Sequence, residues 1–384
     1  MKAAVLGYGT VGAGVYSMLS DAPGMEAGPV LVRPGKAVES FMVSDAALIF
    51  GDPTVDAVVE TLGGLDPAYS YGMRALEAGK HFITANKAMV AAHGLELAAL
   101  AREKGAAFLF SAACGGGVPF LHNLALSAET DRIEAVSGIL NGTTNYMLDA
   151  MQRRGLSYGD ALREAQSLGY AESDPTADVS GLDALRKMQL ACAVAFGVLP
   201  QSGMLCEGME HFTAEDVEDI QSRGLVCRLL ARGSRAGESI SAYVEPVLFP
   251  RAAPESSVFT NNNMARYTGK RCGSIVLMGQ GAGRFPTASA VLRDLSAAQQ
   301  GARSMFPENC RAAEADNREA VHSYYIRTGG FAAVRLPLRS VLAQGEVVRA
   351  VTEPMSAEKM HALAQNIRKD GNDLFFAALE EELC

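Results

Sequence analysis

The sequence Lys2-Ala3-Ala4-Val5-Leu6-Gly7-Tyr8-Gly9-Thr10-Val11-Gly12 decides the fold of the first part of the chain. Its apolar run Ala3–Leu6 predicts a buried strand, and the glycines lead into a predicted helix over Val11–Leu19. In this setting G-x-G-x-x-G is typical of a dinucleotide site, because its glycines allow a tight turn, close approach to a pyrophosphate and close helix packing. A glycine turn with only a structural role is the alternative. The residues predicted to contact a nicotinamide dinucleotide here are Gly7, Gly9, Thr10, Val11 and Gly12.

The second predicted strand, Val30–Val32, ends without the acidic residue that holds a ribose 2′-hydroxyl in NAD-specific sites. It is followed instead by Arg33-Pro34-Gly35-Lys36. A guanidinium forks onto phosphate oxygens, so Arg33 and Lys36 would suit the 2′-phosphate of NADP. The alternative is two solvated basic residues on a surface turn. We expect NADP to be favoured over NAD.

The first 125 residues alternate short apolar runs with segments of helical periodicity, the pattern of βαβ units around a parallel sheet. Predicted helices include Pro67–Ala78 and Ala91–Glu103, with Gly79 and Gly105 at the left-handed position that follows a helix. We expect an α/β fold whose residues 1–125 form a Rossmann-type doubly wound parallel sheet, completed by about 280–305. The predicted strands are Ala3–Leu6, Val30–Val32, Ala57–Glu60, His81–Thr84 and Ala107–Phe110.

After the glycine- and proline-rich stretch Gly115–Pro119, the regular alternation of predicted strands and helices ends. A predicted strand, Ile133–Leu140, leads into longer helices, and Ser239–Leu277 is again rich in strand-forming residues. We expect residues 126–280 to form an α+β domain for catalysis and dimerisation. Residues 320–384 predict a small α+β C-terminal appendix. Its elements are predicted as strands His322–Arg327, Glu346–Val351 and Asp373–Ala378, and a helix over Ala357–Lys369.

The bulk composition narrows the class of protein. The 384 residues carry a formal net charge of −9, which argues against nucleic-acid and anionic-membrane partners but does not identify a partner. The predicted strand begins at Lys2, so we expect no signal peptide, and no apolar run reaches the roughly 18 residues of a membrane span. We expect a cytoplasmic protein with reduced thiols and no zinc site, because the cysteines are scattered and contain no C-x-x-C. They are Cys114, Cys192, Cys206, Cys227, Cys272, Cys310 and Cys384.

The densest set of ionisable residues lies in Gly169–Met188. Pro175 disfavours helical conformation at the residue before it, so we expect a loop over Glu172–Asp178 and a helix capped by Ser180. Asp183 and Lys187 then lie four residues apart on one helical face. An exposed pair of this kind contributes roughly 0.3 kcal/mol and carries no function.

Lys187, however, is followed by a nearly continuous apolar run that ends at Phe196, which predicts a buried helix. A lysine and a carboxylate held together in a buried setting are costly, and such arrangements persist at functional sites. We therefore favour a catalytic role for this pair.

The stretch Gly169–Lys187 resembles the signature of the homoserine dehydrogenase family, Gly-Tyr-x-Glu-x-Asp-Pro-x-x-Asp followed by Gly-x-Asp-x-x-x-Lys. Further motifs of that family occur in the same order along the chain, over residues 3 to about 300. They are Gly7–Gly12, Thr84–Lys87, Gly115–Pro119, Asn141–Tyr146, Gly281–Gly283 and Pro286–Val291.

The resemblance implies reversible hydride transfer between L-homoserine and L-aspartate 4-semialdehyde, in the biosynthesis of threonine, methionine and isoleucine. It implies Lys187 as the proton donor and acceptor, with Lys87 beside it, and we expect burial or a second cation to lower the pKa of Lys187. A surface lysine that caps a helix is the alternative for Lys87. The resemblance also assigns Glu172, Asp183 and Asp178 to the substrate site. Residues it places near the nicotinamide nucleotide are Thr61, Lys87, Gly169 and Gly281.

The family pattern is broken where many members carry a glutamate that helps to bind a monovalent cation. The aligned residue here is Ser111. Carbonyl oxygens of Cys114, Gly116 and Val118 could still bind Na⁺ or K⁺, but without a charged ligand the site should be weaker.

Three further questions stay open at this level. The appendix resembles a regulatory domain of the ACT type in length but shows only a partial βαββαβ pattern, so a capping or dimer-stabilising tail is equally compatible. We expect a homodimer or a higher homo-oligomer. The sequence leaves two alternative functions. One is a phosphate-dependent semialdehyde dehydrogenase with Cys114 as nucleophile, and the other is a dinucleotide-binding protein without catalysis.

Overall fold

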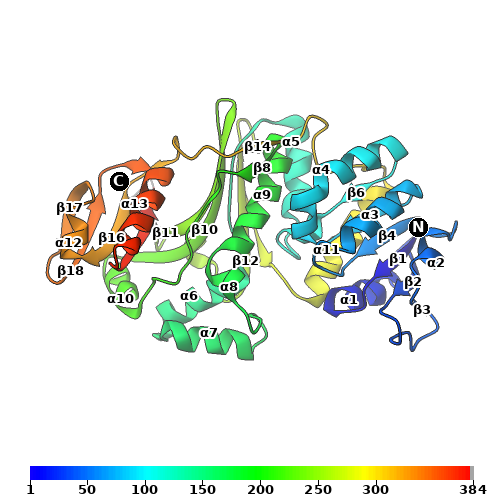
Figure 1. Ribbon diagram of the computed structural model, residues 1–384, viewed down its shortest axis with the longest axis horizontal. Helices are drawn as coiled ribbons and strands as arrows, with labels where there is room; N and C mark the ends of the chain where they lie inside the picture. Colours follow the sequence, from blue (N-terminus) through cyan, green and yellow to red (C-terminus); the bar gives the residue numbers. More distant parts are fainter. Residues whose placement is uncertain (381–384) are drawn as a thin grey trace.

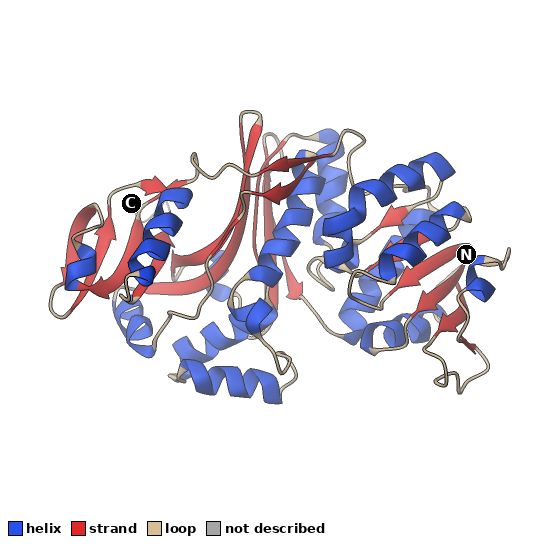
Figure 2. Cartoon of the chain, viewed as in Figure 1, coloured by secondary structure: helices blue, strands red, loops and turns tan. Residues whose placement is uncertain are grey.

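The computed structural model describes residues 1–380, so Cys384 lies outside the described residues. Figure 1 and Figure 2 show an elongated molecule with the N-terminus near one end and the C-terminus near the other. Two large sheets, one near each end, organise it, and a layer of helices lies between them. Within residues 1–380, no helix combines the length and the hydropathy that a membrane crossing requires.

The N-terminal sheet is parallel throughout and has the strand order β3-β2-β1-β4-β5-β6. This is the order of a dinucleotide-binding Rossmann sheet, and it confirms the predicted fold class. The strands are β1 (Lys2–Leu6), β2 (Glu26–Leu31), β3 (Met42–Val43), β4 (Ala57–Glu60), β5 (His81–Thr84) and β6 (Phe108–Leu109). The helices around it are α1 (Thr10–Leu19), α2 (Ala47–Phe50), α3 (Ala68–Glu77), α4 (Lys87–Lys104) and α11 (Arg284–Gln299).

Helix α11 belongs to this sheet although it follows β1 by almost 280 residues. It packs against α1 and also contacts β5, and the backbone N–H of Phe108 donates to the carbonyl of Arg303 just beyond it. The segment from α11 to Arg303 therefore packs against the first sheet.

The second large sheet has ten strands in the order β13-β12-β7-β10-β11-β20-β16-β18-β17, with β9 paired to β11 beside this path. Its strands are β7 (Ile133–Ile139), β9 (Leu205–Cys206), β10 (Leu225–Ala236), β11 (Ser239–Pro250), β12 (Asn262–Gly269), β13 (Gly273–Gln280), β16 (Tyr324–Gly329), β17 (Leu338–Ala343), β18 (Val347–Thr352) and β20 (Leu374–Leu379). Two pairs of short strands complete the set: β8 (Val198–Ser202) with β14 (Arg311–Glu314), and β15 (Val321–His322) with β19 (Met355–Ser356).

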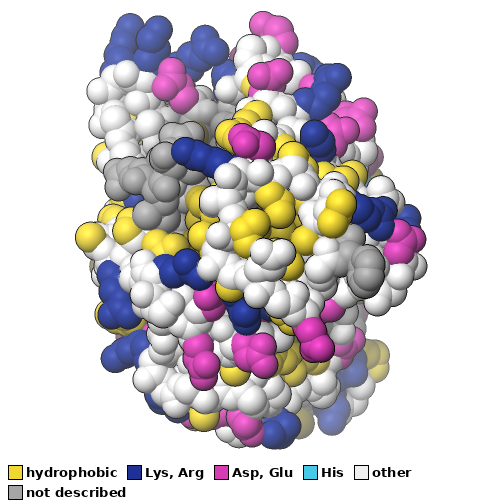
Figure 3. Space-filling view, turned by 90° about the vertical axis from the view of Figure 1, so that its left-hand side faces the viewer, with side chains coloured by type: hydrophobic (Ala, Val, Ile, Leu, Met, Phe, Trp, Pro, Cys, Tyr) yellow, Lys and Arg dark blue, Asp and Glu magenta, His cyan; other side chains and the backbone are white. Residues whose placement is uncertain are grey.

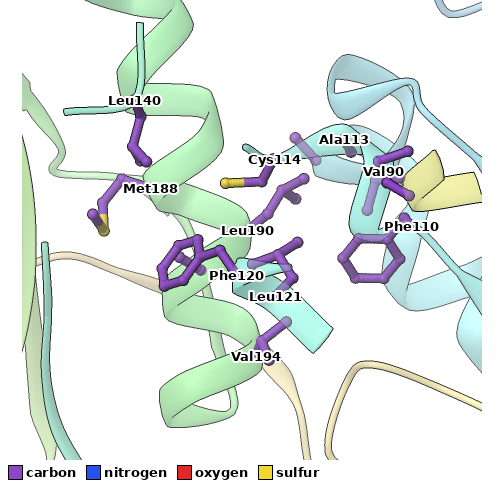
Figure 4. Packing of buried hydrophobic residues seen from close by; sticks show 14 of the residues in the cluster. Val90, Phe110, Ala113, Cys114, Phe120, Leu121, Leu140, Met188, Leu190 and Val194 are labelled. Carbon is purple, nitrogen blue, oxygen red and sulfur yellow. The ribbon is translucent and has the colours of Figure 1, made fainter. Parts of the chain in front are cut away.

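Helix α9 (Leu182–Phe196) forms the centre of the layer between the two sheets. It contacts β7, β10 and β11 on one side and α4 and α5 (Phe120–Thr130) on the other. Figure 4 shows Leu190 and Val194 of α9 packed near Phe120 and Leu121 of α5. The predicted burial of this helix is confirmed, since eleven of its fifteen residues are buried. One apolar core consequently runs from the nucleotide sheet into the second sheet.

The region around the predicted catalytic loop contains three helices: α6 (Gly142–Arg154), α7 (Tyr158–Ser167) and α8 (Thr176–Val179). The expected loop over Glu172–Asp178 is therefore wrong at its end, where α8 begins directly after Pro175. The predicted cap is also wrong: Ser180 ends α8, and Gly181 precedes α9 with a φ of 83°. A left-handed turn at Gly181 separates the two helices, a conformation that glycine adopts without strain.

The C-terminal appendix contains the full βαββαβ series: β16, α12 (Gly330–Ala333), β17, β18, α13 (Ala357–Lys369) and β20. The pattern looked partial because β17 is largely exposed and α12 is a single turn, so neither has a strong periodicity. A separate apolar cluster packs beneath α13. Helix α10 (Ala214–Ser222) packs against β10 and α6, and its Val217 and Ile220 belong to the larger apolar cluster. Figure 3 looks onto this end of the molecule and shows apolar side chains gathered in the middle of the face, with charged groups around them.

Candidate active site

The glycine turn between β1 and α1 is built for a close approach of backbone to ligand. Gly7 has a φ of 98°, and a Cβ at Gly12 would lie 2.1 Å from the Gly7 carbonyl oxygen, so neither position accepts a side chain. A Cβ at Gly9 would meet nothing within 4 Å. Helix α1 begins at Thr10, so the first N–H groups of Thr10, Val11 and Gly12 are free at its N-terminus.

A cavity of about 1040 Å³ lies over this turn. Gly7, Gly9 and Thr61 line it near the carboxyl ends of β1 and β4, where α/β sheets bind ligands. Arg33 and Lys36 line the same cavity and are exposed. The structure thus brings the predicted cofactor residues of the first 61 positions together.

A second cavity of about 570 Å³ lies at the junction of the two sheets. It collects predicted residues that are far apart in sequence. They are Lys87, Gly169, Glu172, Asp178, Asp183, Lys187 and Gly281.

The segment after β5 connects the walls of the two cavities. Asn86 caps α4 by accepting from the N–H of Met89 at 3.1 Å, and its Nδ2 donates to the carbonyl of Gly64 at 2.6 Å. Because of this cap, α4 starts at Lys87, four residues earlier than predicted. The first cavity's rim at Gly63 is therefore held next to Lys87, which lines the second cavity.

Asp183 is the centre of the ionic network in the second cavity. Its Oδ2 lies 2.7 Å from Lys187 Nζ, and its Oδ1 lies 2.9 Å from Lys87 Nζ. The spacing of four residues predicted the first contact. The second contact joins residues almost a hundred positions apart. The side chains of Asp183 and Lys187 are 13% and 11% exposed, so the pair is nearly closed to solvent.

Protonation in this network follows from the pairing. Burial alone raises the pKa of Asp183, but the charges of Lys187 and Lys87 outweigh it and hold that pKa far below its usual range. Burial lowers the pKa of Lys187, yet its contact with Asp183 prevails and the pKa is raised. The expected lowering of the Lys187 pKa is therefore wrong for this state of the molecule, because the nearest group is an anion. Lys187 carries its proton here and also donates to the carbonyl of Leu140 at 2.6 Å.

Asn141 joins the ionic network of the second cavity, although no role of its own was assigned to it from the sequence. Its Oδ1 accepts from the N–H of Thr144 and caps α6, while its Nδ2 donates to Asp183 at 2.9 Å and to Asp178 at 2.8 Å. This explains how Asp178 is tied to the ionic network. The signal was the position of Asn141 directly before a helix, in a motif of the family.

The remaining predicted residues occupy the rim of the second cavity. Glu172 and Gly169 are exposed there, in the turn between α7 and α8, and Gly281 is buried at the opposite wall. Glu172 is exposed and lines the cavity, and within residues 1–380 it forms no salt bridge with Lys187 or Lys87. Tyr170, Arg186 and Asn261 also line the cavity and were not predicted.

Cys114 lies behind this site and is fully buried. Figure 4 shows its sulfur directed toward α9, between Leu140 and Leu190. Burial raises the pKa of the Cys114 thiol to about 12. A thiol that is closed to solvent and neutral is a poor nucleophile, which argues against the semialdehyde dehydrogenase alternative.

Comparisons with known proteins identify the family of these motifs. Residues 7–111 match the family model described as "Homoserine dehydrogenase, NAD binding domain", and residues 119–296 match the model "Homoserine dehydrogenase". Homoserine dehydrogenase of Synechocystis is 38% identical over 319 residues, covering 77% of this chain and 72% of that protein. The Corynebacterium glutamicum enzyme is 39% identical over 313 residues, 76% and 70% of the two chains.

A solved structure extends the similarity to nearly the whole chain. The crystal structure of a homoserine dehydrogenase from Thiobacillus denitrificans superposes with a TM-score of 0.88 at 29% identity, covering 99% of this chain and 98% of that one. The similarity includes the C-terminal appendix, which lies beyond the residues matched by the family models.

Proposed function

Because the chain belongs to the homoserine dehydrogenase family of oxidoreductases, we propose that it transfers a hydride reversibly between L-homoserine and L-aspartate 4-semialdehyde. This places it in the biosynthesis of threonine, methionine and isoleucine. The observation that carries the proposal is the network of Lys187, Asp183 and Lys87 in the second cavity, next to the hydrogen bond from Asn86 to Gly64 at the rim of the dinucleotide cavity.

The proposed division of the chain follows its two sheets. Residues 1–125, completed by about 280–305, hold the dinucleotide, residues 126–280 hold the substrate and the dimer contacts, and residues 320–384 form the appendix. A nicotinamide dinucleotide supplies and accepts the hydride. The residues assigned to hold it are Gly7, Gly9, Thr10, Val11, Gly12, Arg33, Lys36, Thr61, Lys87, Gly169 and Gly281.

The chemistry left to the protein is the movement of one proton. Reduction of the aldehyde carbon leaves an alkoxide on its oxygen, and Lys187 Nζ–H donates a proton to it. In the opposite direction Lys187 must first lose a proton, and then takes the hydroxyl proton of homoserine. Its raised pKa suits the donor role, because the ammonium form is fully populated near neutral pH.

The carboxylates of the second cavity suit an amino-acid substrate. Glu172 is exposed at the rim and Asp178 is half-buried beside Asn141, so each can accept hydrogen bonds from an α-ammonium group. Asp183 contacts both Lys187 and Lys87 and so orients their ammonium groups. Lys87 adds a second positive charge where negative charge develops on the substrate oxygen.

The preference for NADP is proposed on charge. Arg33 and Lys36 line the nucleotide cavity directly after β2, where an NAD-specific site has a carboxylate. Their two positive charges match a 2′-phosphate.

The proposal is tested by following reduced nicotinamide during oxidation of L-homoserine with NADP and with NAD. We expect turnover with both and a higher kcat/KM with NADP. Lys187→Ala should abolish turnover while the affinity for NADPH, measured by fluorescence titration, stays within about twofold of the wild type, because Lys187 lies in the second cavity. Full activity in this variant would exclude Lys187 from proton transfer. NADPH binding without any turnover in the wild type would favour the non-catalytic alternative.

We also propose a cytoplasmic homodimer or higher homo-oligomer. Both edge strands of the ten-stranded sheet expose apolar side chains: Val276 and Met278 on β13 are 40% and 52% exposed, and Val341 on β17 is 52% exposed. Unpaired edges of this kind favour association.

A further inference from the structure

The glycine loop Cys114–Val118 lies directly behind Gly281, which lines the cavity of the proposed active site. The N–H of Gly117 donates to the carbonyl of Gln280 at 3.0 Å, directly before Gly281 in the cavity wall. A Cβ at Gly116 would lie 2.4 Å from the Gly281 carbonyl oxygen, so the two backbones are in direct contact. Any displacement of this loop therefore moves the wall that faces Lys187.

The residues of this loop do not fit the monovalent cation that the family resemblance implies. Ser111 stands in place of the acidic ligand, and its hydroxyl donates to Asp294 at 2.6 Å. The backbone N–H of Ser111 donates to the same carboxylate at 2.8 Å. The carbonyl of Val118, one of three expected ligands, already accepts from the N–H of Phe120 at 2.8 Å. In the described chain, no three His, Cys, Asp or Glu side chains gather as a metal site.

A permanent cation of the protein itself reaches the loop. Arg293 on α11 is half-buried, and its Nη2 donates to the carbonyl of Gly117 at 3.0 Å. Its Nε is buried and has no hydrogen-bond partner among residues 1–380. The neighbouring Asp294 accepts hydrogen bonds from Ser111, and the hydrogen bond of Arg293 to the loop is made to the Gly117 carbonyl.

A guanidinium and an alkali-metal ion share the property that matters here. Each places one positive charge against carbonyl oxygens, and arginine keeps that charge at every accessible pH. The guanidinium is also covalently attached to α11, so its local concentration does not depend on the salt in solution. Its charge would repel Na⁺ or K⁺ from the same carbonyl group.

We propose that Arg293 replaces the monovalent cation as the group that positions the Cys114–Val118 loop, so that the enzyme works without Na⁺ or K⁺. Arg293 is a positioning residue, because it contacts the loop and not the reacting atoms. The inference rests on the proposed function for its activity assay and has a second readout that does not.

The activity test compares homoserine oxidation in tetramethylammonium, sodium and potassium chloride at equal ionic strength. The wild type should show the same kcat/KM within about twofold in all three salts. Arg293→Ala should lose roughly 10- to 100-fold in tetramethylammonium, the cost typical of removing a supporting group of a cation site. Sodium, potassium or added guanidinium should restore part of this loss in a saturable way.

Two variants control for a general loss of structure. Arg293→Lys keeps the charge and should remain active and independent of salt. Arg303→Ala removes an arginine that also donates to backbone carbonyls but lies away from the loop, and it should behave as the wild type. Arg293→Gln replaces the alanine variant if that protein does not fold.

The second readout is the Tm in the three salts, which needs no turnover. Sodium or potassium should raise the Tm of Arg293→Ala above its value in tetramethylammonium and leave the wild-type Tm unchanged. A wild type that requires sodium or potassium overturns the inference while the proposed function stands. A folded Arg293→Ala that ignores the cation in both readouts also overturns it. Absence of homoserine turnover in every salt would overturn the proposed function, and the Tm comparison would still decide on Arg293.

Discussion

Asp183 holds two ammonium groups at once, and this single carboxylate sets the charge of the site. It lies within 2.9 Å of both Lys187 and Lys87. A close anion stabilises the protonated form of an amine. The same residue that keeps Lys187 ready to donate a proton therefore hinders its action as a base.

Asp183→Asn is expected to shift the pH dependence of homoserine oxidation. That direction needs neutral Lys187, so kcat rises as pH passes the Lys187 pKa. Removing the anion lowers this pKa, and the rising limb should move to lower pH by about 1 to 3 units, the effect of one close opposite charge. The maximal kcat should fall as well, because Lys187 loses its orienting partner. A pH profile of kcat checks this, and an unshifted limb would show that Asp183 does not control the lysine.

Arg33→Ser is expected to reduce discrimination between the two dinucleotides. Loss of a charged hydrogen bond to a 2′-phosphate should raise the KM for NADP roughly tenfold or more and leave the KM for NAD nearly unchanged. Steady-state kinetics with both cofactors provide the measurement, with Lys36→Ser as the matched variant on the same turn. An equal effect on both cofactors would remove Arg33 from cofactor selection.

The sequence allowed part of this site to be predicted on physical grounds. The spacing of Asp183 and Lys187 and the apolar run after them predict a buried pair, and the structure contains that pair. The contact of Lys87 with Asp183 had no such signal, because it depends on how two distant segments meet. Asn141 was missed for the same reason: its cap is local, but its bonds to Asp178 and Asp183 are tertiary.

At the scale of elements, the turn between α8 and α9 is connected to the C-terminal appendix by hydrogen bonds. Glu207, just after β9, forms two hydrogen bonds with Arg368 of α13, at 2.6 and 2.9 Å. Residues on both sides of Glu207 hold the turn between α8 and α9. The N–H of Met209 donates to the carbonyl of Val179, and Cys206 Sγ donates to the carbonyl of Ser180. Helix α13 therefore supports the start of the helix that carries Asp183 and Lys187.

Arg368→Ala is expected to destabilise this support. A bidentate pair that is mostly buried should contribute about 2 kcal/mol, and its loss leaves the Glu207 carboxylate unpaired. We expect a lower free energy of unfolding in urea and a higher KM for homoserine, with the KM for NADP unchanged. Arg335→Ala, at an exposed pair with Asp370, is the control for a surface ion pair. Equal changes in unfolding free energy and in KM in the two variants would show that the Glu207–Arg368 pair stabilises the protein no more than a surface ion pair.

Strand prediction succeeded for β4 and β5 and failed for β10. β4 and β5 were predicted at their observed bounds. β10 was not predicted, although it pairs with β11 over twelve positions. Its Arg228 is buried and donates to carbonyls of Glu255, Ser256 and Val258. These partners lie far along the chain, so sequence alone makes such an arginine look exposed.

At the scale of the whole molecule, the ten-stranded sheet ends on each side in a strand that pairs with only one neighbour among the described residues. β13 ends it on the side of the nucleotide module, and β17 ends it at the appendix. Each edge exposes apolar side chains. An edge strand can pair with the edge strand of a second copy, and a charged side chain on that edge disfavours the pairing.

Met278→Glu is expected to shift the protein toward the monomer. The added carboxylate lies on the exposed face of β13 and would have to be desolvated in an edge contact, which is unfavourable. The mass in solution, measured by light scattering over a dilution series, should fall relative to the wild type. Val334→Glu introduces the same charge at a side chain that is 85% exposed and outside the strands, and should leave the mass unchanged. If both variants keep the wild-type mass, β13 takes no part in assembly.

The position of β20 has a consequence for how the protein is made. It is the final strand of the described chain, yet it lies between β11 and β16 and pairs in parallel with the former at Val247 and Leu248. The strands β7 to β13 of the ten-stranded sheet and the strands of the appendix therefore become continuous only after β20 has been synthesised. Until then Val247 and Leu248 of β11 lack a partner on that side, where β9 pairs only with Tyr243 and Val244, so a nascent chain that stalls before β20 leaves this end of β11 as an open edge.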